Sequence, residues 1–323
     1  MSKSKKEEND LLKLLELFPE KRWDYSYLSE NPNITWDIVK NNPDPPGGKW
    51  DYSYLSRNPN ITWDIVENNP EKEWDYFWLS SNSNMNWEIV RNNPEKDWNY
   101  SLLSENPNIT WEIVRNNPEK EWNYFLLSSN PNITWDIVRD NPEKKWNYTL
   151  LSKNPNITWE IVKDNPEKEW NYSLLSSNPN ITWEIVRDNP DPPGGKWDYS
   201  YLSENPNITW DIARDNPDPP GGKWTYFYLS RNPNITWEIV ENNLEKEWNY
   251  SWLSLNPNIT WEIVRNNPEK RLNYALLSQN KFLHDKRSVR YKKRTKEMKL
   301  STKTALQFCI INDVITIVCQ YIS

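Results

Sequence analysis

The 323-residue chain is poor in the residue types from which most catalytic and metal sites are built. It contains one histidine, His284, and only two cysteines, Cys309 and Cys319. Two cysteines ten residues apart in an apolar segment match neither a disulfide framework nor a zinc-binding spacing, so we expect buried free thiols. The composition therefore gives no support to a metal site, a cofactor site or a disulfide scaffold.

The chain also lacks an apolar run of the kind that directs export. Acidic residues interrupt the N-terminal stretch MSKSKKEENDLLKLLELF, which predicts a cytoplasmic protein that is not secreted. The apolar segment 304–323 has a polar stripe that includes Asn312, Asp313 and Gln320, which favours an amphipathic capping helix. A membrane tail anchor is the alternative, because basic residues precede about twenty apolar ones. Asn312 and Asp313 near its centre argue against that alternative, so we expect no membrane partner.

What the chain has in abundance is one repeated stretch. The 24 residues WNYSLLSENPNITWEIVRNNPEKE, from Trp98 to Glu121, recur with few changes, and all 22 tryptophans lie in the copies. A fixed period of this length is typical of a repeat array. We number the positions of a repeat from 1 at the opening tryptophan. The copies begin at Trp23, Trp50, Trp74, Trp98, Trp122, Trp146, Trp170, Trp197, Trp224, Trp248 and, in a decayed eleventh, Leu272.

Each copy predicts two short helices. In the copy at Trp98, Asn99 and Thr110 are the expected N-caps, and Glu112 places negative charge in a first helical turn. Both helices are expected to stop at an Asn-Pro pair, since proline cannot continue a helix. Helices of about six residues are unstable alone, and some are expected to be 3₁₀, so stability must come from stacking between copies.

These patterns predict an all-α solenoid with helical caps at both ends. We expect a tail and capping helix over 1–22, the repeat solenoid over 23–280, a basic linker or helix over 281–303 and a capping helix over 304–323. With helices packed at about 8–10 Å, eleven repeats of 24–27 residues would form a rod or arc roughly 90–110 Å long. Three copies carry an inserted Pro-Pro-Gly-Gly turn, which is expected to enlarge a surface loop only.

Charge is unevenly placed along the chain. The net charge is −7, to which residues 281–303 contribute +8, residues 1–22 contribute +1 and residues 304–323 contribute −1, which leaves −15 on the repeats. An acidic body is repelled by phosphate backbones. Nucleic acid is therefore an unlikely partner for the repeats, and only the basic stretch 281–303 keeps that possibility open.

The repetition itself argues against an active site. Catalysis needs different side chains that converge, whereas near-identical copies present the same side chains everywhere. We therefore predict that the protein is not an enzyme and has no catalytic, cofactor-binding or metal-binding residues. Nine copies contain Asn-Ile-Thr, which matches a glycosylation acceptor, but without a signal peptide a turn asparagine followed by a capping threonine is the better explanation.

Positions that vary among the copies are the candidates for contact with a partner, because no common packing requirement holds them. Aromatic residues occupy positions 4 and 5 irregularly, and position 8 varies most in charge. Arginine is frequent at position 18, where ion pairs with the helix acid three residues earlier are the alternative explanation. The candidate partner-binding residues are Tyr27, Tyr54, Phe77, Trp78, Arg91, Arg115, Phe125, Arg139, Arg187, Tyr201, Arg214, Phe227, Tyr228, Trp252 and Arg265.

The phrase Asn-Pro-Asn-Ile-Thr-Trp-Glu-Ile-Val, with its 24-residue period, resembles the leucine-rich repeat variant family. That resemblance implies a right-handed solenoid of alternating α and 3₁₀ helices over residues 23–280. Tryptophan and tyrosine stand where that family tends to have small or aliphatic residues, and its iron–sulfur cysteine cluster is absent here. The chain is more similar still to the Trp- and NPN-rich tandem repeat proteins of giant DNA viruses, which implies a host-cell setting.

We expect a non-enzymatic scaffold that binds a protein partner, of unknown identity, along one face of an elongated solenoid. A structural component of a virion or inclusion is the first alternative. Binding of carbohydrate or single-stranded nucleic acid through exposed aromatic side chains is the second.

Overall fold

The computed structural model describes residues 10–43, 45 and 48–282, and over these residues the chain is entirely α-helical. Twenty-two short helices follow one another with the period of the sequence repeat. The chain divides into two units, residues 1–281 and 282–323, and the repeats all belong to the first. The prediction of an all-α tandem repeat fold is confirmed.

Each repeat contributes a first helix that begins at the position-3 tyrosine and a second helix that begins at the position-14 tryptophan. The first helices are α2 (Tyr25–Glu30), α4 (Tyr52–Leu55), α6 (Tyr76–Leu79), α8 (Tyr100–Glu105), α10 (Tyr124–Leu127), α12 (Tyr148–Leu151), α14 (Tyr172–Ser176), α16 (Tyr199–Glu204), α18 (Tyr226–Leu229), α20 (Tyr250–Leu253) and α22 (Tyr274–Leu277). The second helices are α3 (Trp36–Asn41), α5 (Trp63–Glu67), α7 (Trp87–Asn92), α9 (Trp111–Asn116), α11 (Trp135–Asp140), α13 (Trp159–Asp164), α15 (Trp183–Asp188), α17 (Trp210–Asp215), α19 (Trp237–Glu241) and α21 (Trp261–Asn266). One further helix, α1 (Asp10–Leu17), precedes the first copy.

The helix boundaries follow the predicted caps. The Asn99 side chain accepts from the Leu102 amide, and Thr110 accepts from the Ile113 amide, so both helices of that repeat begin where expected. Thr225 is an exception, because its hydroxyl makes no cap hydrogen bond. The 3₁₀ helices that were expected are not found among the described residues, where every helix is α.

Two kinds of side chain fill the space between the helices. Aliphatic residues at positions 6, 12 and 17, such as Leu103, Ile109 and Val114, are at most 5% exposed. An aromatic ladder joins the repeats. Tyr100 of repeat 4 makes a T-shaped contact with Trp122 of repeat 5 at 5.4 Å, and Trp111 of repeat 4 contacts Trp146, which opens repeat 6, at 5.8 Å. The opening tryptophan also donates its indole N–H to the preceding repeat, as Trp122 does to the Asn117 carbonyl at 2.8 Å. Burial of these large surfaces is what stabilises helices that could not stand alone.

Besides ending a helix, the Asn-Pro-Asn triplet links each repeat to the one before it. The buried Asn130 side chain donates to the carbonyls of Ser104, Asn106 and Ile109 in the preceding repeat, at 2.8, 3.0 and 3.2 Å. Its own carbonyl oxygen accepts from the Asn132 amide at 2.8 Å. Every repeat has the equivalent buried asparagine at position 9. A ladder of amide side chains therefore satisfies the backbone between repeats and sets their register.

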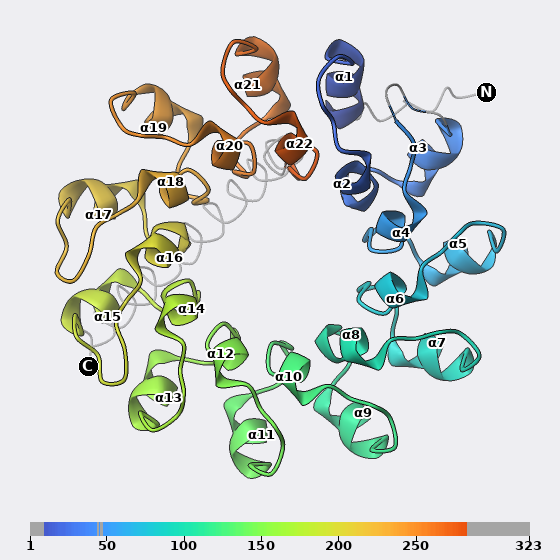
Figure 1. Ribbon diagram of the computed structural model, residues 1–323, viewed down its shortest axis with the longest axis horizontal. Helices are drawn as coiled ribbons and strands as arrows, with labels where there is room; N and C mark the ends of the chain where they lie inside the picture. Colours follow the sequence, from blue (N-terminus) through green and yellow to red (C-terminus); the bar gives the residue numbers. More distant parts are fainter. Residues whose placement is uncertain (1–9, 44, 46–47, 283–323) are drawn as a thin grey trace, which may run out of the picture. The chain divides into compact units, whose positions relative to one another are not determined.

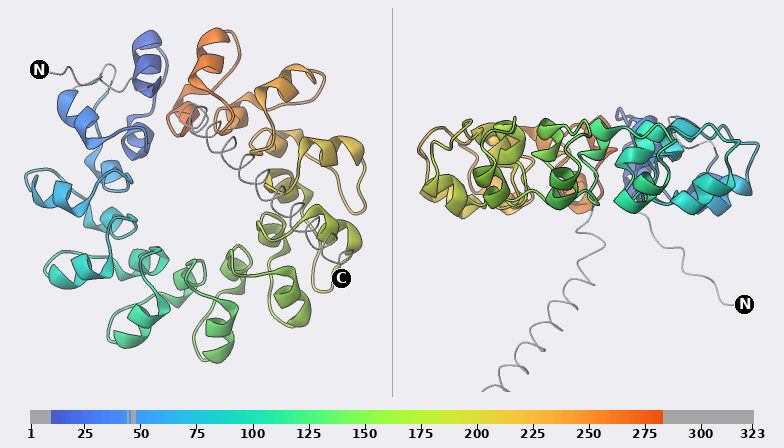
Figure 2. Two further views of the ribbon diagram at one scale, coloured as in Figure 1. Left: turned by 180° about the vertical axis from the view of Figure 1, so that it is seen from behind. Right: turned by 90° about the horizontal axis from the view of Figure 1, so that it is seen from below.

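The array closes on itself, which corrects the prediction of an open rod or arc. Asn31 in the first repeat donates to the carbonyls of Ser278 and Asn280 in the eleventh, at 2.7 and 3.0 Å. The Asp24 amide donates to the Ser278 hydroxyl at 3.0 Å, as the Asn123 amide does to Ser104 within the array. Residues 10–281 thus form a ring, with the first helices on its inner rim and the second helices outside (Figure 1). Seen edge-on, the ring is a single layer of repeats (Figure 2).

Helix α1 supplies the second helix of the eleventh repeat. It packs beside α21, and the Trp23 indole donates to the Phe18 carbonyl at 2.9 Å, the bond that every later opening tryptophan makes to the end of the helix before it. Its leucines Leu11, Leu14 and Leu15 are buried. The helix was expected to cover an open end, but instead the first and last parts of the ring together build one repeat, and the twenty-two helices make eleven complete pairs.

The inserted Pro-Pro-Gly-Gly turns do more than lengthen a loop. The Tyr172 hydroxyl donates to the Pro193 carbonyl at 2.7 Å, and Tyr199 makes the same bond to Pro220. A side chain at Gly195 would overlap the Tyr172 ring, so only glycine lets the turn lie flat on it. In repeats without the insertion a lysine covers the tyrosine, as Lys144 covers Tyr124 at 5.2 Å. Burial under the turn raises the pKa of Tyr172 and of Tyr199.

The predictions for the basic stretch 281–303, beyond residue 282, and for the capping helix over 304–323 concern residues outside the described part of the chain. Among the helices that are described, none has the length and apolarity needed to cross a membrane.

Candidate functional site

The inner rim of the ring carries the surface that packing does not explain. In α8, Leu103 and Ser104 are buried, and positions 5 and 8 lie on the opposite side of the helix. Because the first helices form the inner rim of the ring (Figure 1), we infer that these two positions face its interior. We call the residues at positions 5 and 8 of all eleven repeats the rim stripe. At position 5 every one of these side chains is neither buried nor fully exposed.

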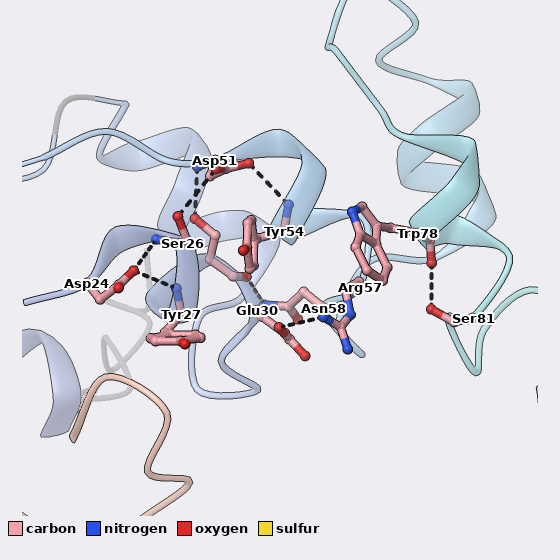
Figure 3. Close-up of polar contacts among 11 residues, drawn as sticks. Asp24, Ser26, Tyr27, Glu30, Asp51, Tyr54, Arg57, Asn58, Trp78 and Ser81 are labelled. Carbon is pink, nitrogen blue, oxygen red and sulfur yellow. Dashed lines mark hydrogen bonds and ion pairs between the residues drawn. The ribbon is translucent and has the colours of Figure 1, made fainter. Parts of the chain in front are cut away.

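Repeats 1 to 3 form the first aromatic cluster of the rim stripe. Tyr27, Tyr54 and Trp78 come from the successive helices α2, α4 and α6 (Figure 3). The Arg57 guanidinium lies 4.5 Å from the centre of the Trp78 ring and 3.5 Å from the Glu30 carboxylate. A hollow of about 340 Å³ opens beside them, lined by Tyr27, Glu30, Asn31, Pro32, Arg57, Gln279 and Lys281. An aromatic surface with both charges at hand is suited to binding a group that is partly apolar and partly charged.

Repeats 8 to 10 form the second aromatic cluster. Tyr201 stacks on Tyr228 at 6.4 Å with 24° between the planes, and Tyr228 lies 6.2 Å from Trp252. Arg231 lies 5.1 Å above the Trp252 ring and 3.9 Å from the Glu204 carboxylate. Burial raises the pKa of Glu204, and the charges of Arg231 and Lys153 lower it in part.

The remaining repeats give the rim stripe a different character. At position 5 they carry leucine, namely Leu102, Leu126, Leu150, Leu174 and Leu276. We call repeats 4 to 7 the leucine arc. The aromatic residues are thus confined to two groups of three repeats rather than spread around the rim.

The phenylalanines at position 4 lie at the edge of the rim, next to the loops that join repeats. Phe77, Phe125 and Phe227 are 45%, 51% and 42% exposed, which is unusual for side chains of this size. Phe125 borders an open hollow of about 650 Å³ together with Ser101, Lys144 and Lys145. Phe227 contacts both Tyr228 and Trp252, so it extends the second cluster.

The candidate arginines lie elsewhere, on the outer helices. Arg139 pairs with Asp136 at 2.7 Å and Asp140 at 3.0 Å, and Arg214 makes the same two contacts with Asp211 and Asp215. Arg187 pairs with Asp188, and Arg265 lies over the Trp261 ring. Arg91 and Arg115 occupy the same exposed position on α7 and α9. The structure therefore separates the predicted aromatic and basic residues onto opposite sides of the ring, and local ion pairs account for several of the latter.

The asparagines of the Asn-Ile-Thr triplets are engaged in structure. The Asn108 side-chain nitrogen donates to the Ser83 carbonyl at 2.6 Å and lies 3.4 Å from that of Met85. A glycan on that nitrogen would disrupt the contact, so the structural interpretation of the triplet is the better one.

The charged side chains of the two aromatic clusters, Glu30, Arg57, Glu204 and Arg231, were not among the predicted site residues. The signal was present in the sequence, since position 8 changes from glutamate to arginine between consecutive copies at the start of both clusters. Within the described residues, no group of three or more His, Cys, Asp or Glu side chains is placed to hold a metal ion.

Comparison with known proteins adds no assignment. No protein-family model, no curated protein and no solved structure matches this chain.

Proposed function

We propose that the protein is a non-enzymatic binding ring whose rim stripe holds a segment of a partner protein. The observation that carries the proposal is the pair of half-exposed aromatic clusters on the inner rim, each with an arginine stacked on a tryptophan. Tyrosine, tryptophan and arginine are the residues that contribute most to protein interfaces. Here they stand on short rigid helices, so little conformational entropy is lost on binding.

The negative charge of the repeats favours a protein partner over nucleic acid. The repeats carry a net charge of −15, which repels phosphate backbones. The resemblance to repeat proteins of giant DNA viruses extends the proposal to its setting, which is the cytoplasm of a host cell with a host protein as the partner.

A structural role in a virion or inclusion is the second candidate, but the closed ring gives it less support than an open rod would. That role relied on a rod acting as a spacer. In a ring, each repeat interface of residues 10–281 is already occupied by a neighbour in the same chain.

The test is capture of partners from cells that express the tagged chain, with variants that separate the two sides of the ring. In the rim variant, Tyr54, Trp78, Tyr228 and Trp252 are all changed to leucine, the residue that repeats 4 to 7 carry at this position. In the control, Arg139 and Arg214 on the outer helices are changed to glutamine. A protein recovered in stoichiometric amount with the wild type and the control, but not with the rim variant, supports the proposal. Recovery that is equal with all three, or only of assembled particles, contradicts it.

A further inference from the structure

The two aromatic clusters are copies of one three-repeat module. Repeats 1 to 3 read YSYLSE, YSYLSR and YFWLSS over their first helices, and repeats 8 to 10 read YSYLSE, YFYLSR and YSWLSL. No other three consecutive repeats have Tyr, Tyr and Trp at position 5 together with Glu and Arg at position 8. The module is therefore present twice in the ring, in the same orientation along the chain.

The side chains of the two modules adopt the same arrangement. Glutamate of the first repeat pairs with arginine of the second, and that arginine lies over tryptophan of the third, in Glu30–Arg57–Trp78 and again in Glu204–Arg231–Trp252. A single such cluster could be an accident of surface packing. Its recurrence seven repeats away, with the same two contacts, indicates a site that is used twice.

We infer that the rim stripe holds two equivalent binding sites for extended, proline-rich, basic peptide segments, a conclusion that rests on the proposed function. Main-chain pairing with a partner strand is ruled out as the binding mode, because the described residues contain no strand and the asparagine ladder engages the carbonyls between repeats. Recognition must then use side chains. Rows of tyrosine and tryptophan faces are the surface on which preformed polyproline II segments dock.

The basic character of the ligand follows from the net charge of −15 on the repeats, because within each module the glutamate is balanced by an arginine. The chain itself places a guanidinium on the tryptophan and against the glutamate, so each module already shows how this surface binds an arginine side chain. A ligand guanidinium would stack on a tyrosine of the module and share the carboxylate with the chain's own arginine. The acidic repeats would attract it over longer range.

Isothermal titration calorimetry tests the inference with a twelve-residue peptide of four Pro-Pro-Arg units. We expect two peptides per ring, and at least tenfold weaker binding of a peptide of four Gly-Ser-Arg units, which has equal charge but no preformed helix. Trp78→Leu and Trp252→Leu should each lower the stoichiometry to one, and the double variant should abolish binding. Leu244→Pro, at a side chain that is 60% exposed, introduces the proline that the other nine full repeats carry at position 21; it is the matched control and should leave two sites. Unchanged circular dichroism and melting of all variants show that the ring remains folded.

Other results would overturn the inference in distinct ways. Equal binding of both peptides would mean a response to charge alone. Binding of cellohexaose or of a twenty-nucleotide oligothymidylate, without binding of the proline peptide, would assign the clusters to carbohydrate or single-stranded nucleic acid. Loss of both sites in either single variant would show that the modules are not independent. If no peptide binds while partner capture still depends on the rim, the inference fails and the proposed function stands.

Discussion

The seam of the ring, where repeat 11 meets repeat 1, shares its hydrogen bonds and its Tyr–Trp contact with the interior interfaces, but leucine replaces two tryptophans of the ladder around it. Asn31 reaches across the seam as Asn130 reaches across an interior interface. The tryptophan ladder, however, is interrupted near the seam, because Leu272 stands at position 1 of the eleventh repeat and Leu12 at position 14. The amide ladder thus aligns any two repeats, whereas the amount of aromatic burial varies from interface to interface.

The largest effect is expected when the position-9 asparagine is removed, either at the seam (Asn31) or at an interior interface (Asn130). Asn130→Ala leaves buried carbonyls without a donor and should lower the free energy of unfolding by about 2–4 kcal/mol. Asn31→Ala should have a cost of the same order, because it makes equivalent bonds to Ser278 and Asn280.

Urea unfolding of both variants measures these costs, and small-angle X-ray scattering follows the radius of gyration. A seam that opens would raise the radius in Asn31→Ala but not in Asn130→Ala. If Asn31→Ala has no effect on stability or size, the ring is already open in solution and the comparison fails.

A tryptophan in place of Leu272 tests the same comparison by strengthening an interface near the seam instead of weakening it. Leu272 is 7% exposed, and seven of the ten tryptophans at the same position are 6–8% exposed. Leu272→Trp should therefore fit, donate its indole N–H to the Asn267 carbonyl and raise the unfolding free energy by about 1–2 kcal/mol. Thermal unfolding should show an increase of a few degrees. Leu17→Trp, at a side chain that is 52% exposed, is the control and should change little.

An interior interface also has a defect that can be repaired. The Thr225 hydroxyl is buried without a hydrogen-bond partner, although this position caps α18. Thr225→Asp introduces the cap that Asp198 provides for α16 and should add about 1 kcal/mol of stability. Thr225→Val should be close to neutral in the same melting experiment, since it removes a hydroxyl that makes no bond. A large loss with valine would mean that the hydroxyl has a partner after all.

The smallest expected effect is a dependence on pH at the interface between repeats 8 and 9. Burial raises the pKa of Glu204 above its ordinary value of 4.5, so the folded state holds that proton more tightly than the unfolded state. The stability that this carboxyl confers is complete below pH 4.5 and is lost as the pH rises through the folded-state pKa. Glu204→Gln should therefore gain stability relative to the wild type between pH 4 and pH 7, by less than about 1 kcal/mol because the group is partly exposed. An unchanged difference in melting temperature over that range would contradict this.

Much of the local structure could be predicted from single repeats, because caps, stops and apolar spacing act over a few residues. Asn99, Thr110 and the Asn-Pro pairs mark helix boundaries in any context. Closure could not be predicted in this way, since it depends on a small rotation between repeats that accumulates around the array. The N-terminal leucines looked like a cap because the sequence does not show that Leu14 and Leu15 complete a repeat whose first helix is some 260 residues away.

The candidate site was predicted only in part for a related reason. Variation among copies pointed correctly to positions that packing leaves free, and it identified Tyr54 and Trp78 as well as Arg139. It could not tell which of these share a surface, because positions 5 and 18 lie on different helices of the repeat. Only the curvature of the ring places one set inside and the other outside.

Closure also limits how this protein can change in evolution. In an open array, a duplicated or deleted repeat alters length and little else, since each unit touches only its neighbours. In a ring of eleven repeats, each repeat is rotated by about 33° relative to the next. If one repeat were added or lost, the rotation at every other interface would have to change for the ring to close. The repeat number should therefore be inherited as a fixed quantity, while side chains on the rim remain free to diverge.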